Sequence, residues 1–564
     1  MDNIRLLLIL SLGAVLFLIY QAWVQDYGMP EQQPVPQAET SAPEPASTAD
    51  TVPSDAPDAP PPVPAAEAVG QSSTVADAGP AAQDREPIVV ETDLIRAEIS
   101  RIGGTIDSLW LKDYAQTAKQ PDVDFRLLKP VPPNMFIVQS GLLGGEGVDL
   151  PTHKSPFEAA KASYSLAEGK DSVTVEMHWS GDAGIEVIKR YRFERGSYVI
   201  QAEQEIVNNS TAAVALRDYA QLQRTDYHNP EQPRFVKTYT GAAYYGPETK
   251  YKKESFDEIT KQPLDSQVMD GWIAMMQHYF MAAWIPPKGT EETFYTKTVD
   301  GDRYIIGMYS PTVTVTPGAT HTFTSRLFAG PKLQDKLAQI TPGLELAVDY
   351  GWLTIIAEPI FWLLEKIHWL VGNWGWSIII LTVLIKLAFY KLSETSYKSM
   401  ANMRKLAPRM QALKDRYGDD KERLNQAMME MYKKEKINPL GGCLPILVQI
   451  PVFISLYWVL NESVELRHAP FIFWLDNLTA PDPYYVLPLI MGVSMFVQQH
   501  LNPPPPDPIQ AKLLMALPFV FTVFFAFFPS GLVLYWTVNN LLSIAQQWHI
   551  TRNIEKAEAA KRAA

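Results

Sequence analysis

Five apolar segments in the C-terminal third constrain this 564-residue chain more than any other feature. A helix needs about 20 apolar residues to cross the hydrocarbon core of a bilayer, and shorter spans thin the bilayer locally. Together with an apolar run near the N-terminus, they predict six transmembrane helices. The expected fold class is a multi-domain membrane protein with an all-α polytopic core. The segments are Leu6–Val24, Trp374–Tyr390, Leu444–Leu460, Tyr484–Val497, Leu513–Phe528 and Leu532–Trp548.

The N-terminal run has two interpretations. A cleaved signal peptide has a shorter apolar region that is followed by small residues. Here the run ends in bulky residues from Ile19 to Val24, which favours an uncleaved transmembrane anchor over residues 1–24. No cysteine lies near this segment, so a lipoprotein anchor is excluded.

Residues 25–87 are rich in Pro, Ala, Ser and acidic residues and poor in large apolar residues. The 45 prolines of the chain exceed the usual share of about 5%. Such a segment buries too little apolar surface to offset the entropy of ordering it. We therefore expect residues 25–87 to form an extended, disordered tether.

From Ile88 the sequence changes to short β-branched or alternating runs, separated by turn residues such as Gly103-Gly104 and Pro317-Gly318. Many short strands without helices between them are typical of an antiparallel sandwich or barrel. We therefore expect an all-β domain over residues 88–330. Its clearest predicted strands are Ile88–Thr92, Val173–Met177, Ile185–Ile188 and Val313–Thr316.

Residues 331–371 combine apolar residues at helical spacing with interrupting charges. That frequency of charges argues against a membrane span. We expect a linker and an interfacial amphipathic helix, anchored by Trp352, Trp362 and Trp369. An ordinary buried helix is the alternative.

The charged loops set the predicted orientation. Residues 391–440 hold 12 Lys and Arg against 7 Asp and Glu, and the tail 549–564 holds four basic and two acidic residues. By the positive-inside rule, both segments face the cytoplasm. Six spans that begin in the cytoplasm also end there, so both termini are expected on that side. The β domain then lies in the periplasm of a bacterium, beside a five-helix core at residues 372–548 in the inner membrane.

The composition excludes several classes of function. A net charge of -13, from 49 basic and 62 acidic residues, argues against a nucleic-acid target. The single cysteine, Cys443, excludes an internal disulfide framework and a cysteine-based zinc site. The sequence contains no GxxxxGK[ST], HExxH, CxxC or GxSxG motif. We expect neither an enzyme nor a bound metal or cofactor.

Lys386 is the most informative residue, because it lies inside the apolar run 374–390. A cation near the bilayer centre costs about 2.5–3.5 kcal/mol on insertion scales, and such residues usually face a polar cavity or a partner. Thr382 lies one helical turn before Lys386, which favours a polar stripe. The alternative is that Lys386, a few residues from the cytoplasmic end, extends its ammonium group to the headgroups.

Other predicted spans also contain polar residues. On the last span, Trp536, Asn539 or Asn540, and Ser543 share one helical face. Ordinary hydrogen bonding between helices, about 0.6 kcal/mol a pair, is the plainer explanation for each of them. With Lys386 they suggest a hydrophilic cavity within the membrane that favours transient anionic groups, since no acidic residue lies in these spans. The predicted groove residues are Lys386, Thr382, Gln449, Tyr535, Trp536 and Asn539.

Residues 392–438 mix charges with methionine and leucine, and Gly418 divides them. We expect a cytoplasmic helical hairpin whose Met-rich face can adapt to varied partners. Plain packing of the two arms against each other is the alternative. Residues 502–508 contain five prolines and predict a stiff polyproline turn between spans.

Two segments carry a family resemblance. Residues 438–445, NPLGGCLP, and residues 528–536, FPSGLVLYW, resemble signature segments of the YidC/Oxa membrane protein insertase family. The match covers roughly residues 374–552. The whole chain resembles the Gram-negative members in its order of anchor, tether, periplasmic β domain, interfacial helix and five-span core.

The resemblance implies insertion and assisted folding of inner-membrane proteins, alone or with the Sec translocon. The expected partners are nascent membrane proteins, the Sec translocon with its accessory proteins, the ribosome and the lipid bilayer. The family's groove cation corresponds to Lys386, although most relatives carry Arg there, and Lys lacks the bidentate fork of Arg. The β domain resembles a supersandwich that is related to sugar-binding folds.

Two other functions stay open on the sequence. A small-solute transporter would also place polar residues in its spans, but it usually shows an internal repeat, and none is visible. A membrane-anchored periplasmic carbohydrate-binding protein or enzyme would use the β domain, with acids such as Glu176 and Glu186.

Overall fold

The computed structural model describes residues 86–145, 148–227, 238–299, 302–418, 420–435, 444–501 and 508–563. It contains two compact units. One joins Ser54–Lys398 to Gly442–Ala564, and the other joins Met1–Pro53 to Ser399–Gly441. The predicted anchor, almost all of the tether, the NPLGGC part of the first signature and the prolines of 502–507 lie outside the described residues.

The β domain consists of two sheets. One has the order β14 (Asp265–Met269), β17 (Glu291–Val299), β18 (Arg303–Tyr309), β11 (Val214–Thr225), β5 (Phe136–Gly144), β3 (Ile106–Thr117), β2 (Ile95–Ile99), β1 (Ile88–Glu91), β7 (Ser163–Ser165), with β19 (Val313–Val315) beside β11 and β4 (Gln120–Leu128) beside β3. The other has the order β13 (Lys252–Glu254), β12 (Gly241–Tyr245), β15 (Trp272–Met276), β16 (Phe280–Ile285), β20 (Thr320–Pro331), β10 (Val199–Asn208), β9 (Ile185–Glu194), β8 (Ser172–Ser180), β6 (Glu158–Ala159). Apart from the parallel pair β1–β7, the described strand pairs are antiparallel, which confirms the sandwich prediction.

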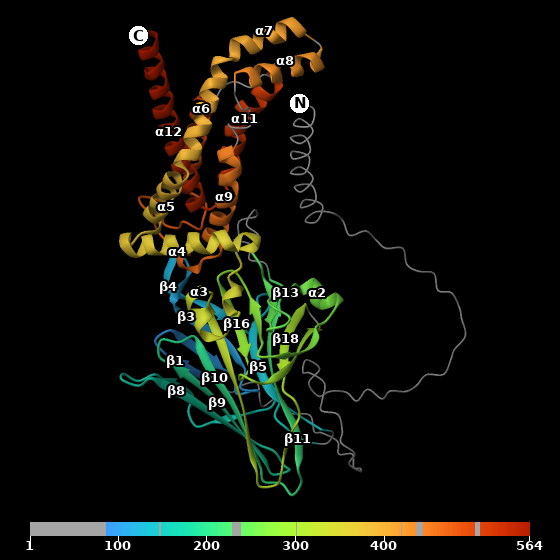
Figure 1. Cartoon of the computed structure of the whole chain (residues 1–564). Helices are drawn as coiled ribbons and strands as arrows, with labels where there is room; N and C mark the ends of the chain where they lie inside the picture. The colour runs from blue at the N-terminus through green and yellow to red at the C-terminus, as the bar shows by residue number, and fades with distance from the viewer. Residues whose placement is uncertain are drawn as a thin grey trace, which may run out of the picture. The chain divides into compact units, whose positions relative to one another are not determined.

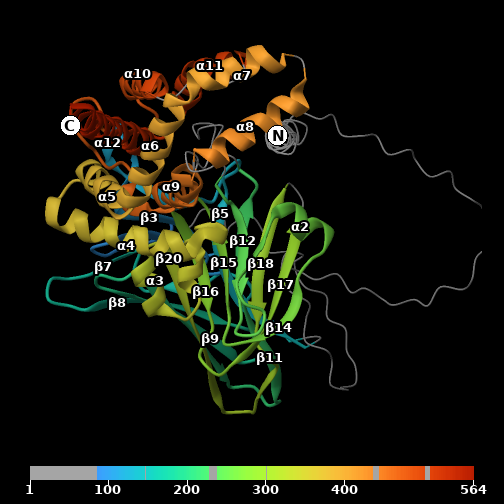
Figure 2. The same ribbon diagram turned by 45° about the horizontal axis from the view of Figure 1, so that its top comes forward.

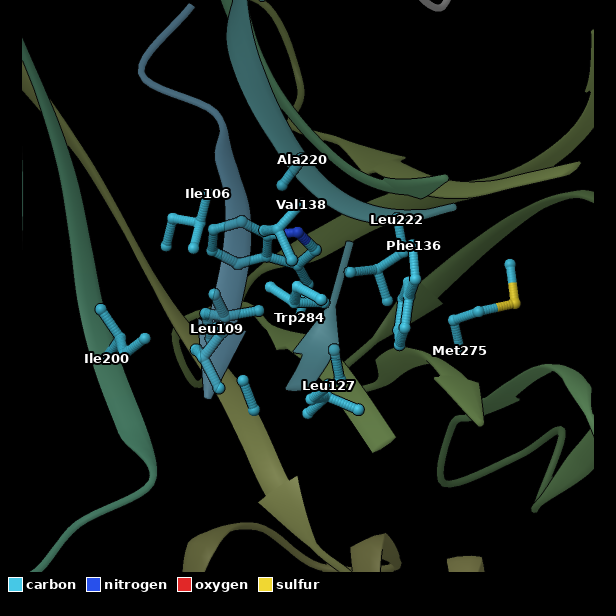
Figure 3. Packing of buried hydrophobic residues seen from close by; sticks show 14 of the residues in the cluster. Ile106, Leu109, Leu127, Phe136, Val138, Ile200, Ala220, Leu222, Met275 and Trp284 are labelled. Atoms are coloured by element: carbon cyan, nitrogen blue, oxygen red, sulfur yellow. The ribbon is translucent and has the colours of Figure 1, made fainter. Parts of the chain in front are cut away.

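The inward faces of the two sheets form one core. Along β9 every second side chain is buried, as expected for a strand with one face in the core. Trp284 of β16 is fully buried, and its Nε1 donates a hydrogen bond to the Gln221 carbonyl oxygen of β11, 3.3 Å away. Figure 3 shows side chains of β3, β5 and β11 around this tryptophan. Because the strand period is two, this contact fixes which face of each sheet points inward.

The strands β15 and β16 are buried on both faces, and this attaches the helices to the β domain. Their alternate residues divide between two clusters: Ile273 and Met275 face the sandwich core, whereas Trp272, Ala274 and Met276 join a cluster that contains the helices. A strand that is covered on both faces has a continuous apolar sequence, and the sequences WIAMM of β15 and FMAAWI of β16 fit this rule.

The helical part begins directly after β20. Its elements are α3 (Gln334–Ile340), η2 (Leu344–Ala347), η3 (Gly351–Leu353), α4 (Thr354–Val371), α5 (Trp374–Ala388), α6 (Tyr390–Lys405), α7 (Ala407–Tyr417), α8 (Lys421–Lys434), α9 (Leu444–Glu462), η5 (Val464–Leu466), α10 (Val486–Leu501), α11 (Pro508–Phe525) and α12 (Ser530–Ala563). One short helix, α2 (Phe256–Lys261), lies within the β domain, where the sequence pattern predicted none.

The helix α4 is amphipathic, as predicted. Phe361 and Leu364 are buried against the helix cluster, whereas Trp362 and Trp369 are 59% and 80% exposed. Trp352 is also exposed, but it lies in η3, before α4 begins, and so is not part of the amphipathic helix. Figures 1 and 2 show α4 crossing beside α5 and α9. Its place at the bilayer surface stays a prediction.

A buried polar junction fixes the end of α9 to the β domain. Lys332, just after β20, lies 3.4 Å from the carboxylate of Glu462, and both side chains are less than a tenth exposed. Nε2 of His278 donates a hydrogen bond to the Asn461 carbonyl oxygen at 2.8 Å. Burial lowers the pKa of His278 to about 4, so the ring is neutral at pH 7. The β domain and α9 are thus joined by specific polar contacts as well as by apolar packing.

The helix bounds differ from the predicted spans. Among the described residues no single helix is both long and apolar enough to span a membrane, whereas Trp374–Ala388 and Tyr390–Ala401, bent by 66°, are so when taken together. The number of spans therefore stays a prediction. The helix α12 continues through the charged tail to Ala563, because an apolar run marks the part of a helix that avoids water and not its end.

The predicted hairpin has three helical pieces, and from Ser399 onward it belongs to the unit that joins Met1–Pro53 to Ser399–Gly441. Its first arm breaks at Leu406, between α6 and α7, and α8 forms the other arm. Arg409 pairs with Glu435 at 2.6 Å, and the Tyr432 hydroxyl lies 3.1 Å from the sulfur of Met410. Met410 and Met428 are buried, so part of the methionine face is used in packing the arms together.

Candidate functional site

Lys386 lies near the end of α5 and is only 8% exposed. Its Nζ donates a hydrogen bond of 2.7 Å to Oγ of Ser543 on α12. The Ser543 hydroxyl in turn donates to the Asn539 carbonyl oxygen at 2.7 Å. Tyr397 of α6 also interacts with Ser543. Within the described part of the chain Lys386 forms no ion pair, so a polar residue holds the ammonium group and no carboxylate neutralises it.

Thr382 lies one turn before Lys386 and is fully buried. Its hydroxyl donates a 2.6 Å hydrogen bond to the Ile378 carbonyl oxygen, four residues back in the same helix. Such back-bonding satisfies the hydroxyl locally and leaves only its acceptor capacity for another group. Thr382 therefore contributes less to a polar surface than its position suggests.

A second set of polar contacts joins α10 to α12. Nδ2 of Asn540 lies 3.3 Å from Oγ of Ser494, and the Ser494 hydroxyl donates to the Met491 carbonyl oxygen at 2.6 Å. Asn540 is buried, whereas the side chain of Asn539 is half-buried and forms no hydrogen bond within the described part. These contacts match the plainer explanation of the sequence pattern, in which polar residues hold two helices together.

Tyr535 and Trp536 lie in an aromatic cluster with residues of α9 and α11. The Phe453 ring stacks against Tyr535 at 6.1 Å and meets Trp536 edge-on at 4.7 Å. Nε1 of Trp536 is buried without a hydrogen-bond partner, as is Oγ of Ser455 on α9. Two unpaired buried donors on neighbouring helices leave hydrogen-bonding capacity between α9 and α12.

The predicted set is thus only partly brought together. Lys386 and Thr382 share α5, and Tyr535 and Trp536 share the aromatic cluster. Gln449 is half-buried on α9 and hydrogen-bonds to none of them in the described part. The predicted set omits Ser494 and Ser455, and it also omits Ser543 and Asn540, which the sequence had placed on the polar face of the last span. Ser543 lies seven residues after Trp536, and that helical spacing was the available signal.

Glu176 and Glu186, the two β-domain acids named from the sequence, lack the features of a hydrolytic pair. Glu176 accepts a 2.7 Å hydrogen bond from Arg190, and this contact keeps the pKa of its carboxyl below the usual value. A general acid needs a raised pKa. Glu186 on β9 lies opposite Ser180 on β8, and Ser180 is four residues along the strand from Glu176. The Glu186 carboxylate accepts a 3.4 Å hydrogen bond from Nδ2 of Asn209. The described metal-ligating residues form no cluster that could hold an ion.

Comparisons with known proteins identify the family. The model of the YidC periplasmic domain matches residues 87–363, and that of the 60Kd inner membrane protein matches residues 366–558. The membrane protein insertase YidC of Thioalkalivibrio sulfidiphilus is 51% identical over 570 residues, with 99% of each chain covered. That of Methylococcus capsulatus is 50% identical over 560 residues, covering 99% of this chain and 100% of the relative.

A solved structure is also similar, namely the active YidC insertase crystal structure with the first transmembrane domain resolved. It is 17% identical, covers 82% of this chain and 92% of that chain, and gives a TM-score of 0.37. The assignment rests on the sequence matches, which extend over the periplasmic and the membrane part. The chain belongs to the YidC family of membrane protein insertases.

Proposed function

We propose that the chain inserts proteins into the inner membrane and helps them fold, by means of a polar groove among α5, α9, α10, α11 and α12. The observation that carries the proposal is Lys386, a buried ammonium group with no carboxylate partner in the described part of the chain. Such a group favours an anion that arrives from outside. The acidic or polar segment that a client must move across the membrane supplies that anion.

The energetics require no covalent step. The Lys386 ammonium group, Ser543 and the spare donors of Ser455 and Trp536 lower the cost of bringing a short polar segment among the helices. The apolar helix of the client then leaves into lipid, because burying its apolar surface is favourable. Short spans thin the bilayer locally and so further lower the free-energy barrier to moving the polar segment across it.

The finer topology belongs to the same proposal. We assign six spans, with the N-terminal anchor at residues 1–24 and five spans built on α5, α9, α10, α11 and α12. The excess of basic residues at 391–440 and in the tail supports cytoplasmic termini and a periplasmic β domain. The Sec translocon and the ribosome are proposed partners, with the α7–α8 hairpin receiving the nascent chain.

The test is insertion into liposomes that contain only the purified chain. The readout is protease protection of a single-span client with an acidic translocated tail. Lys386→Ala should slow insertion by about 10- to 100-fold, because a hydrogen bond to a charged group contributes about 1.5–3 kcal/mol, at about 1.4 kcal/mol for each factor of ten. Lys386→Arg keeps the charge and should retain most of the rate.

A client with an uncharged tail is the matched control. Its insertion should change little in Lys386→Ala, since it offers no anion to the ammonium group. Equal insertion of the acidic client by the parent chain and by Lys386→Ala would refute the charge role. Insertion no better than in empty liposomes would count against independent insertase activity.

A further inference from the structure

The loop between η5 and α10 presents aromatic side chains to the surroundings. Phe473 is 85% exposed, Tyr484 is 68% exposed and Tyr485 is 51% exposed. Phe473 and Tyr485 both have φ of 57°, in the left-handed region. This conformation costs a bulky residue roughly 1–2 kcal/mol, so the surrounding structure must hold it in place.

Asp482 holds the loop. It is 1% exposed, and its Oδ1 accepts hydrogen bonds of 3.0 Å from the indole N–H of Trp474 and from the backbone N–H of Tyr484. Its Oδ2 accepts a 2.7 Å bond from the backbone N–H of Leu487, in the first turn of α10. The Trp474 ring stacks on Phe473 at 6.0 Å and meets Tyr484 edge-on at 6.5 Å. The exposed rings are therefore positioned by a buried carboxylate.

The same loop is bonded to the starts of two other helices. The backbone N–H groups of Ser530 and Gly531, which begin α12, donate to the carbonyl oxygens of Ala480 and Leu478 at 2.8 and 2.9 Å. Nδ2 of Asn373, the N-cap of α5, donates to the Phe471 carbonyl oxygen at 3.2 Å. These hydrogen bonds hold the loop in a fixed position beside the N-terminal ends of α5, α10 and α12.

An apolar face continues from the loop along α10. Leu489 and Val493 are 58% and 65% exposed, and Tyr484 and Tyr485 immediately precede this helix. The α10 segment lies within the match to the inner membrane protein model, so lipid is the medium that covers such a face. Trp376 of α5, 46% exposed, meets Phe471 edge-on at 5.6 Å and extends the aromatic surface.

We propose that this loop is a preorganised membrane anchor, which places Phe473, Tyr484 and Tyr485 in the interfacial layer of the bilayer. Aromatic rings favour the headgroup level, where an apolar ring meets a wet edge. Asp476 is exposed on the same loop, and its carboxylate opposes entry into the hydrocarbon core. The inference rests on the proposed membrane orientation, since it assigns the loop to the outer leaflet.

Because the chain has a single cysteine, one substitution removes all native labelling sites for a spin label. In a Cys443→Ser background, labels are attached through Phe473→Cys, Val493→Cys and Val131→Cys, one at a time, in the full chain in lipid nanodiscs. Val131, 67% exposed in the β domain, is the water control, and Val493 is the lipid control. Accessibility to oxygen reports on lipid, and accessibility to a water-soluble nickel complex reports on water.

The label at position 473 should show less nickel accessibility than the label at 131, and less oxygen accessibility than the label at 493. Values equal to those at 131 would overturn the anchor. A label screened from both reagents, or coupled to a label of a second copy, would assign the surface to a protein contact and also overturn it. Water-like values at 493 would instead refute the membrane placement of α10, on which the proposed function depends.

Discussion

Replacing Lys332 with methionine is expected to lower the free energy of local unfolding at the junction by about 3–5 kcal/mol. The change leaves the Glu462 carboxylate buried without its cation, and an uncompensated buried charge is costly. Asn461 still donates to Glu462 at 3.1 Å, but one neutral hydrogen bond does not replace the ion pair. Hydrogen exchange of the segments around β16 and the end of α9 measures the effect. We expect exchange there to accelerate about 100-fold or more, at roughly 1.4 kcal/mol for each factor of ten.

The matched control removes both charges. The double variant Lys332→Met with Glu462→Leu should recover most of the lost stability, because apolar replacement of a buried ion pair is often neutral. Exchange far from the junction, for example in β9, should stay unchanged in both variants. If Lys332→Met exchanged like the parent chain, the buried pair would not stabilise the junction.

Replacing Glu292 with glutamine is expected to stabilise the β domain at pH 8 but not at pH 4. Glu292 of β17 is 6% exposed and lies near the Asp218 carboxyl of β11. Burial, and secondarily Asp218, raise the pKa of Glu292 from 4.5 to about 8. Among the described residues Glu292 has no ion-pair partner, so its ionised form has no compensating charge.

The number of protons bound by the folded and unfolded states decides whether stability rises or falls with pH. Between pH 4.5 and pH 8 the folded state holds a proton on Glu292 that the unfolded state has lost, so stability falls as pH rises. The full effect is about 3–5 kcal/mol, at 1.36 kcal/mol per unit of pKa difference. Burial also raises the pKa of Asp218, to about 6. Asp218 therefore adds a further loss of stability as pH rises, over a lower pH range than Glu292.

Urea unfolding of the full chain in detergent, at pH 4, 6 and 8, measures this dependence. The difference between Glu292→Gln and the parent chain should grow with pH. Two buried groups oppose this trend. Burial lowers the pKa of His278 to about 4 and that of Lys189 to about 7, so their contributions to stability rise between pH 4 and pH 6.5 and between pH 7 and pH 10.5. Comparing the two chains at the same pH cancels both effects. A pH-independent difference would contradict the raised pKa of Glu292.

The described strands and helices were largely predictable, because each is encoded by neighbours along the chain. The alternation of β9 and the unbroken apolar runs of β15 and β16 follow from how many faces each strand buries. Boundaries were less predictable. The break at Leu406 and the extension of α12 to Ala563 depend on local backbone geometry and not on apolar content.

Lys386 was predictable because a cation in an apolar run is costly wherever the chain folds. Its partner was not, since the contact with Ser543 joins residues 157 positions apart. The choice between Asn539 and Asn540 depended on how α12 is rotated against α10, which side-chain packing decides.

The sequence by itself determined the class of protein: an all-β domain joined to an apolar helical core that carries one unusual cation. Periodicity, composition and two signature segments suffice for this, because each is a local property of the chain. Only the tertiary structure decided which charges are buried together, such as Lys332 with Glu462 and Glu292 near Asp218. It also decided that Asp482 fixes the exposed rings of Phe473 and Tyr484. The physical reason is that the energy of a buried polar group is set by neighbours that the fold brings from distant positions.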